Sequence, residues 1–225
     1  MKHIVVLSGA GISAESGLRT FRDSDGLWEN YRIEDVATPE AWHKDPALVL
    51  DFYNQRRVQL LTAKPNKGHL ALVELERSYQ VTIITQNVDD LHERAGSSTV
   101  IHLHGELRKS RSTLNPKLIY DIDGWSLNLG DKCELGSQLR PHIVWFGEMV
   151  PELERAAEIV SAADIIIVTG TSLAVYPAAR LIDYTPFDCR KYIIDPKAPR
   201  VHSSFRVIQQ TAGDGIPSLV EELLC

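Results

Sequence analysis

The sequence has few cysteines, no long hydrophobic run and no excess of positive charge. Its three cysteines, Cys133, Cys189 and Cys225, lie far apart, which argues against a disulfide framework and favours a reducing, cytoplasmic setting. No apolar stretch approaches the roughly 18 residues that a membrane helix needs, and the N-terminus does not resemble a secretory signal. The formal net charge of −6 argues against non-specific nucleic-acid binding. We therefore expect neither a membrane nor a nucleic-acid partner.

The length and composition are those of one globular unit. With 225 residues, 44% of them hydrophobic, the chain can bury a sizeable core and has room for a second small lobe, but not for two full domains. No repeat and no clear signal for oligomerisation is present, so a monomer is the simplest expectation.

Short apolar runs rich in β-branched residues alternate with segments of helical spacing. The runs are nearly all apolar, which is typical of strands covered on both faces. The expected strands are Ile4–Leu7, Val81–Thr85, Thr99–Leu103, Ile143–Phe146, Ile165–Val168 and Tyr192–Ile194. The expected helices are Pro46–Ala63, Lys67–Tyr79, Pro151–Ala163 and Ile216–Leu224. This alternation predicts an α/β fold, with a Rossmann-like parallel sheet and helices on both faces.

Two insertions interrupt the alternation and predict a small second lobe. They cover about residues 25–79 and 105–141, which leaves about 1–24, 80–104 and 142–225 for the large lobe. A cleft between the lobes would lie over the carboxyl ends of the strands, where open α/β sheets bind ligands.

The first strand runs into a glycine-rich turn of the G-x-G-x-x-A type that binds dinucleotides. Gly9 permits a tight turn, Gly11 allows a pyrophosphate to approach the backbone, and Ala14 allows close packing. The alternative is an ordinary strand–turn–helix corner. An acidic residue about 20 positions later, which a dehydrogenase of this type needs for the ribose, is missing. Its absence counts against hydride transfer.

Polar clusters follow two further strands. Gln86, Asn87 and Asp89 come directly after one, and Thr169–Ser172 follows another. The amide and carboxylate of the first cluster can bind hydroxyls or a carboxamide, and the small residues of the second suit the close approach of a ligand. Either cluster can equally be a helix N-cap that satisfies free backbone N–H groups.

Two histidines close another expected strand. Alternation puts His102 and His104 on one face, and His104 lies at the strand end, which makes it the better general-base candidate. A structural role is the alternative. A metal site from this pair is less favoured, because no convincing further ligands accompany them.

Taken together, these motifs resemble those of the sirtuins, and they occur in that family's order over nearly the whole chain. The matching segments are Gly9–Gly17, Thr20–Arg22, Thr85–Asp89, His102–Gly105, Arg140–Glu148 and Gly170–Ser172. The resemblance implies a protein-lysine deacylase that uses NAD, with acylated lysines of proteins or peptides as substrates. In the family's mechanism the acyl oxygen displaces nicotinamide from the ribose, and the products are free lysine, nicotinamide and O-acyl-ADP-ribose.

The resemblance also implies residue roles. Asn87, Asp89 and His104 would be catalytic, with His104 as the general base. Val144, Phe146 and Gly147 would pair with the substrate backbone as a short added strand. The residues implied for NAD are Gly9, Ala10, Gly11, Ile12, Ser13, Ala14, Glu15, Thr20, Phe21, Arg22, Trp28, Gln86, Asn87, Val88, Asp89, Gly170, Thr171, Ser172, Ile193, Ile194, Asp195 and Ala212.

One pair of residues resembles the mark of a branch that prefers succinyl and malonyl groups. Tyr53 and Arg56 are three residues apart in an expected helix and therefore share a face. Arginine can hold a carboxylate with two hydrogen bonds, and tyrosine can add a third. The alternative is a solvated helix surface, because Arg57 and Lys64 make this stretch generally basic.

The sequence departs from most sirtuins at the structural zinc. Segment 105–141 contains one cysteine, Cys133, which cannot make a tetrahedral sulfur site. We therefore expect no metal, and a lobe held by packing around Leu118, Ile119, Tyr120 and Trp125. Two rival functions remain open at this point: an NAD-dependent ADP-ribosyltransferase, and a non-catalytic module that senses NAD or ADP-ribose.

Overall fold

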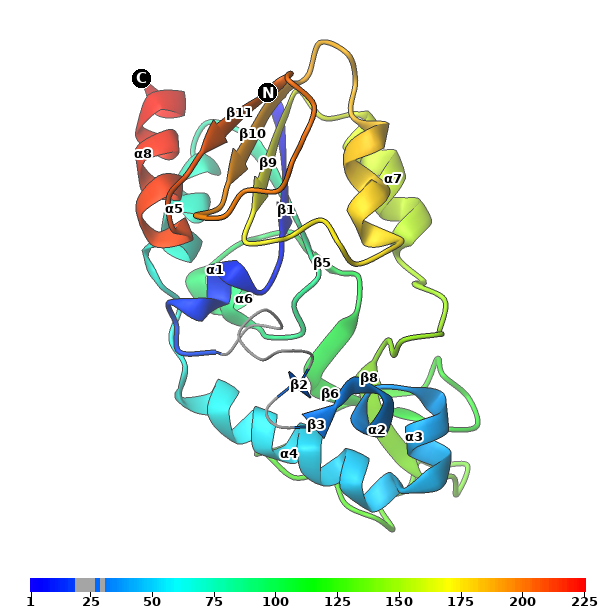
Figure 1. The fold of residues 1–225 in the computed structure, drawn as a ribbon. Helices are drawn as coiled ribbons and strands as arrows, with labels where there is room; N and C mark the ends of the chain where they lie inside the picture. The colour runs from blue at the N-terminus through cyan, green and yellow to red at the C-terminus, as the bar shows by residue number, and fades with distance from the viewer. Residues whose placement is uncertain (19–26, 29–30) are drawn as a thin grey trace.

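The computed structural model describes residues 1–18, 27–28 and 31–225, which fold into two lobes (Figure 1). The large lobe is built on a six-stranded parallel sheet in the order β11-β10-β9-β1-β4-β5. Its strands are β1 (His3–Ser8), β4 (Gln80–Thr85), β5 (Val100–His102), β9 (Ile165–Thr169), β10 (Arg190–Ile194) and β11 (Phe205–Ile208). This architecture confirms the predicted Rossmann-like α/β fold.

Alternate side chains of the strands enter two separate apolar cores. Ile4 and Val6 of β1 face one side, where α5 (Lys67–Leu75) and α8 (Ala212–Leu224) pack together. Val5 and Leu7 face the other side, which is covered by α7 (Leu153–Ser161) and the 3₁₀ helix η1 (Ala178–Tyr184). Figure 1 shows α5 and α8 along one side of the sheet and α7 along the other. Burial on both faces explains why these strands are apolar throughout.

The small lobe combines helices with an antiparallel sheet in the order β7-β6-β8. Its elements are the antiparallel pair β2 (Leu27–Trp28) and β3 (Tyr31–Arg32), helices α2 (Ile33–Val36), α3 (Pro39–Lys44) and α4 (Pro46–Thr62), and strands β6 (Gly105–Ser112), β7 (Ile119–Asp121) and β8 (Leu139–Ile143). Two short helices, α1 (Gly11–Ala14) and α6 (Leu91–Ala95), follow β1 and β4 at the junction of the lobes.

Two expectations about the elements were wrong, and one strand was not expected at all. The run Ile143–Phe146 is no strand of the parallel sheet: β8 ends at Ile143 and pairs with β6, because Ile143 and Trp145 pack in the small-lobe core. The edge strand β11 was missed, because Arg206 and Val207 are exposed and the strand lacks a continuous apolar run. Helix α5, assigned to the small lobe, belongs to the large one, because Leu72 and Leu75 pack beneath the sheet.

Buried polar side chains fasten segment 105–141 to α4. The Arg57 guanidinium, which is fully buried, donates from Nε to the Trp125 carbonyl at 2.8 Å and from Nη1 to the Leu107 carbonyl at 3.2 Å. Asn54 exchanges two hydrogen bonds with the backbone of Leu127. The stretch around Arg57 is thus no solvated helix surface.

The expected packing of segment 105–141 was also wrong in detail. Ile119 and Trp125 are about half exposed, and the buried contacts come instead from Leu107, Ile122 and Leu127. Within the described ranges, no three histidine, cysteine or acidic side chains gather in a way that could hold a metal ion. No helix in the described part of the chain has the length and apolarity to cross a membrane.

Candidate active site

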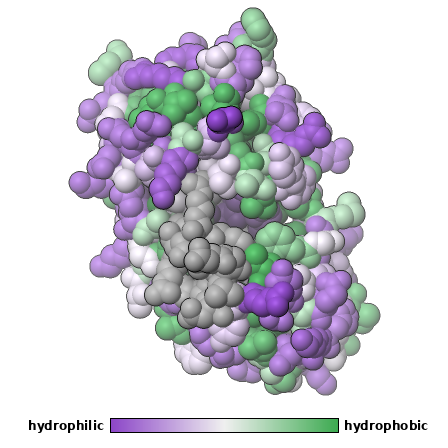
Figure 2. Space-filling model, viewed as in Figure 1, coloured by the Kyte–Doolittle hydropathy of each residue, from purple (hydrophilic) through white to green (hydrophobic). Residues whose placement is uncertain are grey.

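A cleft of about 490 Å³ lies between the lobes. Its large-lobe wall is formed by the turns at the carboxyl ends of β1, β4, β9 and β10, and its small-lobe wall by α4, β6 and residues 143–148. Figure 2 shows hydrophilic side chains spread over both lobes and an apolar patch near their junction. A concave site with both kinds of lining suits a ligand with charged and apolar parts.

The two glycine turns of the large lobe are in direct backbone contact. The Gly11 N–H donates to the Gly170 carbonyl at 2.8 Å. A Cβ at Gly11 would lie 2.6 Å from the Gly170 Cα, and Gly170 itself has a positive φ of +62°. Because Gly11 and Gly170 have no side chains, the turns after β1 and β9 can touch each other. The wall of the cleft is also left as bare backbone at these two positions.

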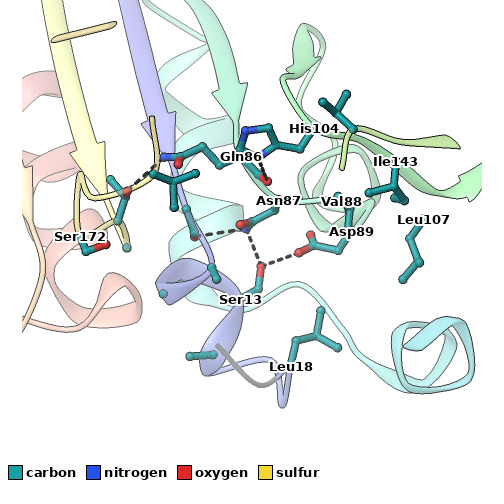
Figure 3. A pocket seen from close by; sticks show the side chains of 18 of the residues that line it. Ser13, Leu18, Gln86, Asn87, Val88, Asp89, His104, Leu107, Ile143 and Ser172 are labelled. Atoms are coloured by element: carbon teal, nitrogen blue, oxygen red, sulfur yellow. Dashed lines mark hydrogen bonds between the residues drawn. The ribbon is translucent and has the colours of Figure 1, made fainter. Parts of the chain in front are cut away.

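Three buried polar side chains form a directional hydrogen-bond chain on the floor of the cleft (Figure 3). The Asn87 amide donates to Ser13 Oγ at 3.1 Å and to the Gly9 carbonyl at 3.2 Å. Ser13 Oγ in turn donates to Asp89 Oδ2 at 2.9 Å. Burial raises the pKa of Asp89, and hydrogen bonds from Leu91 N–H and Ser13 partly offset that rise. The network fixes the orientation of all three groups without a ligand.

His104 is held as a neutral ring whose Nε2 has no hydrogen-bond partner among the described residues. Its Nδ1 lies 3.0 Å from the Gln86 carbonyl, and because a carbonyl only accepts, Nδ1 must carry the proton. Burial lowers the pKa of His104, and the bond to Gln86 partly counteracts this. The ring lines the cleft, so Nε2 is the nitrogen that can take a proton there.

His102 has a different role from His104. Its Nδ1 lies 3.1 Å from the Asn87 carbonyl and its Nε2 lies 2.7 Å from Glu93 Oε1. Burial lowers the pKa of His102, but the hydrogen bond and charge of Glu93 outweigh that effect and raise it overall. With both nitrogens engaged, His102 orients the turn after β4.

Beside β9 and β10, polar contacts join separate segments that line the cleft. Gln86 Nε2 donates to Thr171 Oγ1 at 3.0 Å, which joins the turns after β4 and β9. The Glu15 carboxylate accepts from Gly213 N–H at 2.7 Å and from Thr211 Oγ1 at 3.0 Å, at the start of α8. Negative charge is favoured at a helix N-terminus, so Glu15 fixes α8 against the glycine turn.

The opposite end of the cleft contains Tyr53 and Arg56. Both come from α4 and both line the cleft, together with Trp145. The Trp145 indole Nε1–H donates to the Tyr53 hydroxyl at 3.0 Å. The Arg56 guanidinium carbon lies 5.8 Å from the centre of the Phe52 ring. A cation and a phenol therefore share one end of the site, as an acidic group would require.

The structure brings most of the predicted residues to the cleft. They are Gly9, Ala10, Gly11, Ser13, Ala14, Glu15, Tyr53, Arg56, Gln86, Asn87, Val88, Asp89, His104, Val144, Phe146, Gly147, Gly170, Thr171, Ser172, Ile194, Asp195 and Ala212. Ile12 and Ile193 are not among the lining residues, and their side chains lie in the two cores of the large lobe, which leaves their backbone for a cofactor contact. Thr20, Phe21 and Arg22 lie outside the described residues, and Trp28 is described only as backbone in β2.

Several lining residues were missed from the sequence. Leu18 and Leu107 contribute apolar surface, Thr211 lies beside Ala212, and Trp145 backs Tyr53. Trp145 lies between Val144 and Phe146 in the sequence. In an extended segment its side chain points to the opposite side from theirs, which here is toward the core of the small lobe. No local signal marks Leu107, which reaches the cleft only because β6 crosses beneath α4.

Comparison with known proteins agrees with this geometry. The model of the Sir2 family matches residues 9–177, which is well over half of the chain. The chain belongs to the Sir2 family. An NAD-dependent protein deacylase of Bacteroides thetaiotaomicron is 54% identical over 231 residues, covering 100% of this chain and 99% of the relative. One of Helicobacter pylori is 55% identical over 226 residues, covering 100% and 98%.

Solved structures of this family share the fold of the chain. A Sir2 homologue in complex with NAD has a TM-score of 0.90 and 44% identity, covering 99% of this chain and 90% of the other. A mutant of a Sir2 homologue in complex with ADP ribose has a TM-score of 0.91 and 43% identity, covering 99% and 92%. The sirtuin resemblance of the motifs is thereby confirmed.

Proposed function

We propose that this sirtuin is an NAD-dependent protein-lysine deacylase that releases nicotinamide and O-acyl-ADP-ribose. The observation that carries the proposal is His104, which lines the same cleft as the Ser13–Asn87–Asp89 network and has its Nδ1 proton bound to the Gln86 carbonyl. The named deacylases and the NAD-bound homologue described above support it.

The residues of the cleft fit NAD. The two glycine turns leave backbone rather than side chains at the wall, which suits close approach of phosphates. The Asn87 amide nitrogen is engaged with Ser13 and Gly9, so its oxygen remains available to a carboxamide or hydroxyl donor. Bound NAD supplies a ribose carbon whose bond to nicotinamide can break.

His104 supplies the base in this proposal. Its lowered pKa keeps the ring neutral at pH 7, and its Nε2 can accept a proton from a ribose hydroxyl as that hydroxyl becomes a nucleophile. The Gln86 carbonyl then stabilises the imidazolium through the Nδ1 proton. General-base steps of this kind contribute about 10² to 10⁴ in rate.

We further propose that the enzyme removes succinyl and malonyl groups as well as acetyl groups. Arg56 and Tyr53 lie one helical turn apart on α4 and line the same end of the cleft. A guanidinium and a phenol can together bind the terminal carboxylate of an acidic acyl chain.

The small lobe folds, in this proposal, without a structural zinc ion. The Cys133 Sγ lies 3.3 Å from Ser112 Oγ and 3.2 Å from Ser137 Oγ. The two serine hydroxyl oxygens are 2.8 Å apart. These hydrogen bonds join the turns that bracket segment 113–136. A chelator should leave the melting temperature unchanged; stoichiometric metal in purified protein would contradict the proposal.

Mass spectrometry of paired acetyl-lysine and succinyl-lysine peptides, with and without NAD, tests the activity. Loss of the acyl group only with NAD, together with O-acyl-ADP-ribose, is the expected result. ADP-ribosylated protein without deacylation would favour ADP-ribosyl transfer instead. No turnover by folded protein that binds NAD would favour a sensing module.

A further inference from the structure

We infer that Trp145 is a positioning residue for acyl selectivity: its indole N–H forces the Tyr53 hydroxyl to accept, which directs the hydroxyl proton to an acidic acyl group. The inference rests on the proposed removal of succinyl and malonyl groups. In addition to Tyr53 and Arg56, it assigns a role to Trp145, which sets the direction in which the Tyr53 hydroxyl donates its proton.

The direction of the hydrogen bond follows from the chemistry of the two groups. The Trp145 Nε1 lies 3.0 Å from the Tyr53 hydroxyl oxygen. An indole nitrogen can only donate, whereas a phenol can donate one proton and also accept. The hydroxyl therefore uses a lone pair toward Trp145, and its own proton must point away from the indole.

That proton has no acceptor among the described residues. The Tyr53 hydroxyl makes no hydrogen bond other than that with Trp145 within this part of the chain. Tyr53 and Trp145 are buried in the small-lobe core except where they line the cleft, so the proton can meet an acceptor only from the cleft side. A buried donor left unpaired is costly, and a ligand oxygen that enters the cleft relieves the cost.

This arrangement distinguishes acyl chains by their terminal group. A succinyl or malonyl chain ends in a carboxylate, which can accept from Tyr53 and pair with Arg56; an acetyl group offers neither contact. Burial raises the pKa of Tyr53 well above its usual value, and the hydrogen bond from Trp145 and the charge of Arg56 only partly offset this. The phenol is therefore a proton donor at any physiological pH.

Trp145 is itself held in place before any ligand binds. The Arg140 guanidinium carbon stacks 3.3 Å from the centre of the Trp145 ring. Arg140 donates to both oxygens of Glu148, at 2.7 and 3.0 Å, and Glu148 Oε2 also accepts from the Trp145 backbone N–H at 2.8 Å. The Glu148–Arg140–Trp145–Tyr53 series thus preorganises the donor, which lowers the cost of binding.

A double-mutant cycle with Trp145→Phe and Tyr53→Phe tests the inference. Phenylalanine keeps an aromatic ring for Arg140 and removes the N–H donor. It also shortens a core side chain, a loss of packing that lowers both activities together. We expect Trp145→Phe to lower kcat/KM for a succinyl peptide about tenfold more than for an acetyl peptide, which is the loss of one oriented hydrogen bond to a charged group. In a Tyr53→Phe background the same change should leave the succinyl-to-acetyl ratio unaltered, because the hydroxyl that it orients is gone.

The ratio separates positioning from a structural role. Partial unfolding lowers both rates equally and cancels from the ratio. An unchanged ratio in Trp145→Phe, or the same further fall in the Tyr53→Phe background, would overturn the inference.

Arg56→Met in the same assay reports on the proposed function. If it lowers both activities equally, the acidic pocket itself fails, and this inference fails with it. If it is selective while Trp145→Phe is not, only the role of Trp145 is wrong.

Discussion

The two walls of the cleft are built on different principles. On the large-lobe wall, backbone turns and short side chains such as Ser13 and Asn87 satisfy each other at the ends of buried strands. Behind the small-lobe wall, long buried side chains such as Arg57 and Arg140 reach across from one segment to another. The large-lobe wall depends on backbone geometry, which tolerates few substitutions. The small-lobe wall depends on side chains, and their substitution can change which acyl group the cleft accepts.

The largest expected effect comes from removing the proposed general base, His104, from the large-lobe wall. His104→Ala should lower kcat by about 10³-fold, because the proton acceptor is lost, while NAD binding is largely retained. Steady-state kinetics with calorimetric titration of NAD would measure both. His102→Ala is the control: both its nitrogens are engaged in structural bonds, so it should affect stability more than kcat. Full activity of His104→Ala would contradict the assignment of His104 as the general base.

Gly11→Ala tests whether the large-lobe wall depends on backbone contact. The new Cβ would lie 2.6 Å from the Gly170 Cα, so we expect a loss of about 2 kcal/mol of stability and weaker NAD binding. In the small lobe, Gly124→Ala meets no atom within 4 Å and costs only the strain of its positive φ of +72°. Equal destabilisation by the two variants, in chemical denaturation, would show that the contact between the turns is unimportant.

Acid should weaken the large lobe through two buried histidines. His69 and His92 lie with ring centres 4.9 Å apart beneath the glycine turn, and His92 Nε2 is 3.0 Å from Ser8 Oγ. Burial lowers the pKa of His69 to about 4 from 6.5, and burial also lowers that of His92. The unfolded chain therefore binds more protons below pH 6.5, and stability falls as the pH drops from there toward 4.

For one such histidine the loss is about 2 kcal/mol at pH 5. Thermal melts of the wild type and His69→Gln at pH 7.5 and pH 5 would measure it, and the variant should lose less on acidification. His102, whose pKa is raised, acts in the opposite sense: its contribution is present below pH 6.5 and is lost as the pH rises through its folded-state value. An identical pH dependence in wild type and variant would exclude His69 as the source.

The smallest expected effect is a change of selectivity on the small-lobe wall. Arg56→Met should lower desuccinylation about tenfold more than deacetylation, because a carboxylate partner is removed. Its neighbour provides the control: Arg57→Met removes buried bonds to the Trp125 and Leu107 carbonyls, so it should lower stability and both activities together. Matched kcat/KM values on the two peptides would decide between these patterns.

The sequence predicted the large lobe well because its information is local. Apolar runs, the glycine turns and the polar residues that follow β4 and β9 each lie within a few neighbouring positions, and parallel strands must bring their carboxyl ends together. His104 was identified in the same way, from its place after β5. The errors arose where an apolar run could join either sheet, as at Ile143, or where an edge strand is exposed, as at Val207.

The sequence by itself determined the α/β class, the turn that carries Gly9 and Gly11, and the candidate base, because chain-local pattern and turn chemistry encode them. Only the tertiary structure decided that Arg57 is buried beside a cleft-lining Arg56, that Gly11 meets Gly170, and that Trp145 donates to Tyr53. The Gly11–Gly170 and Trp145–Tyr53 contacts join residues that are distant in the chain. Arg56 and Arg57 are neighbours that differ in the direction in which their side chains point. Packing of whole elements, rather than local preference, sets such contacts.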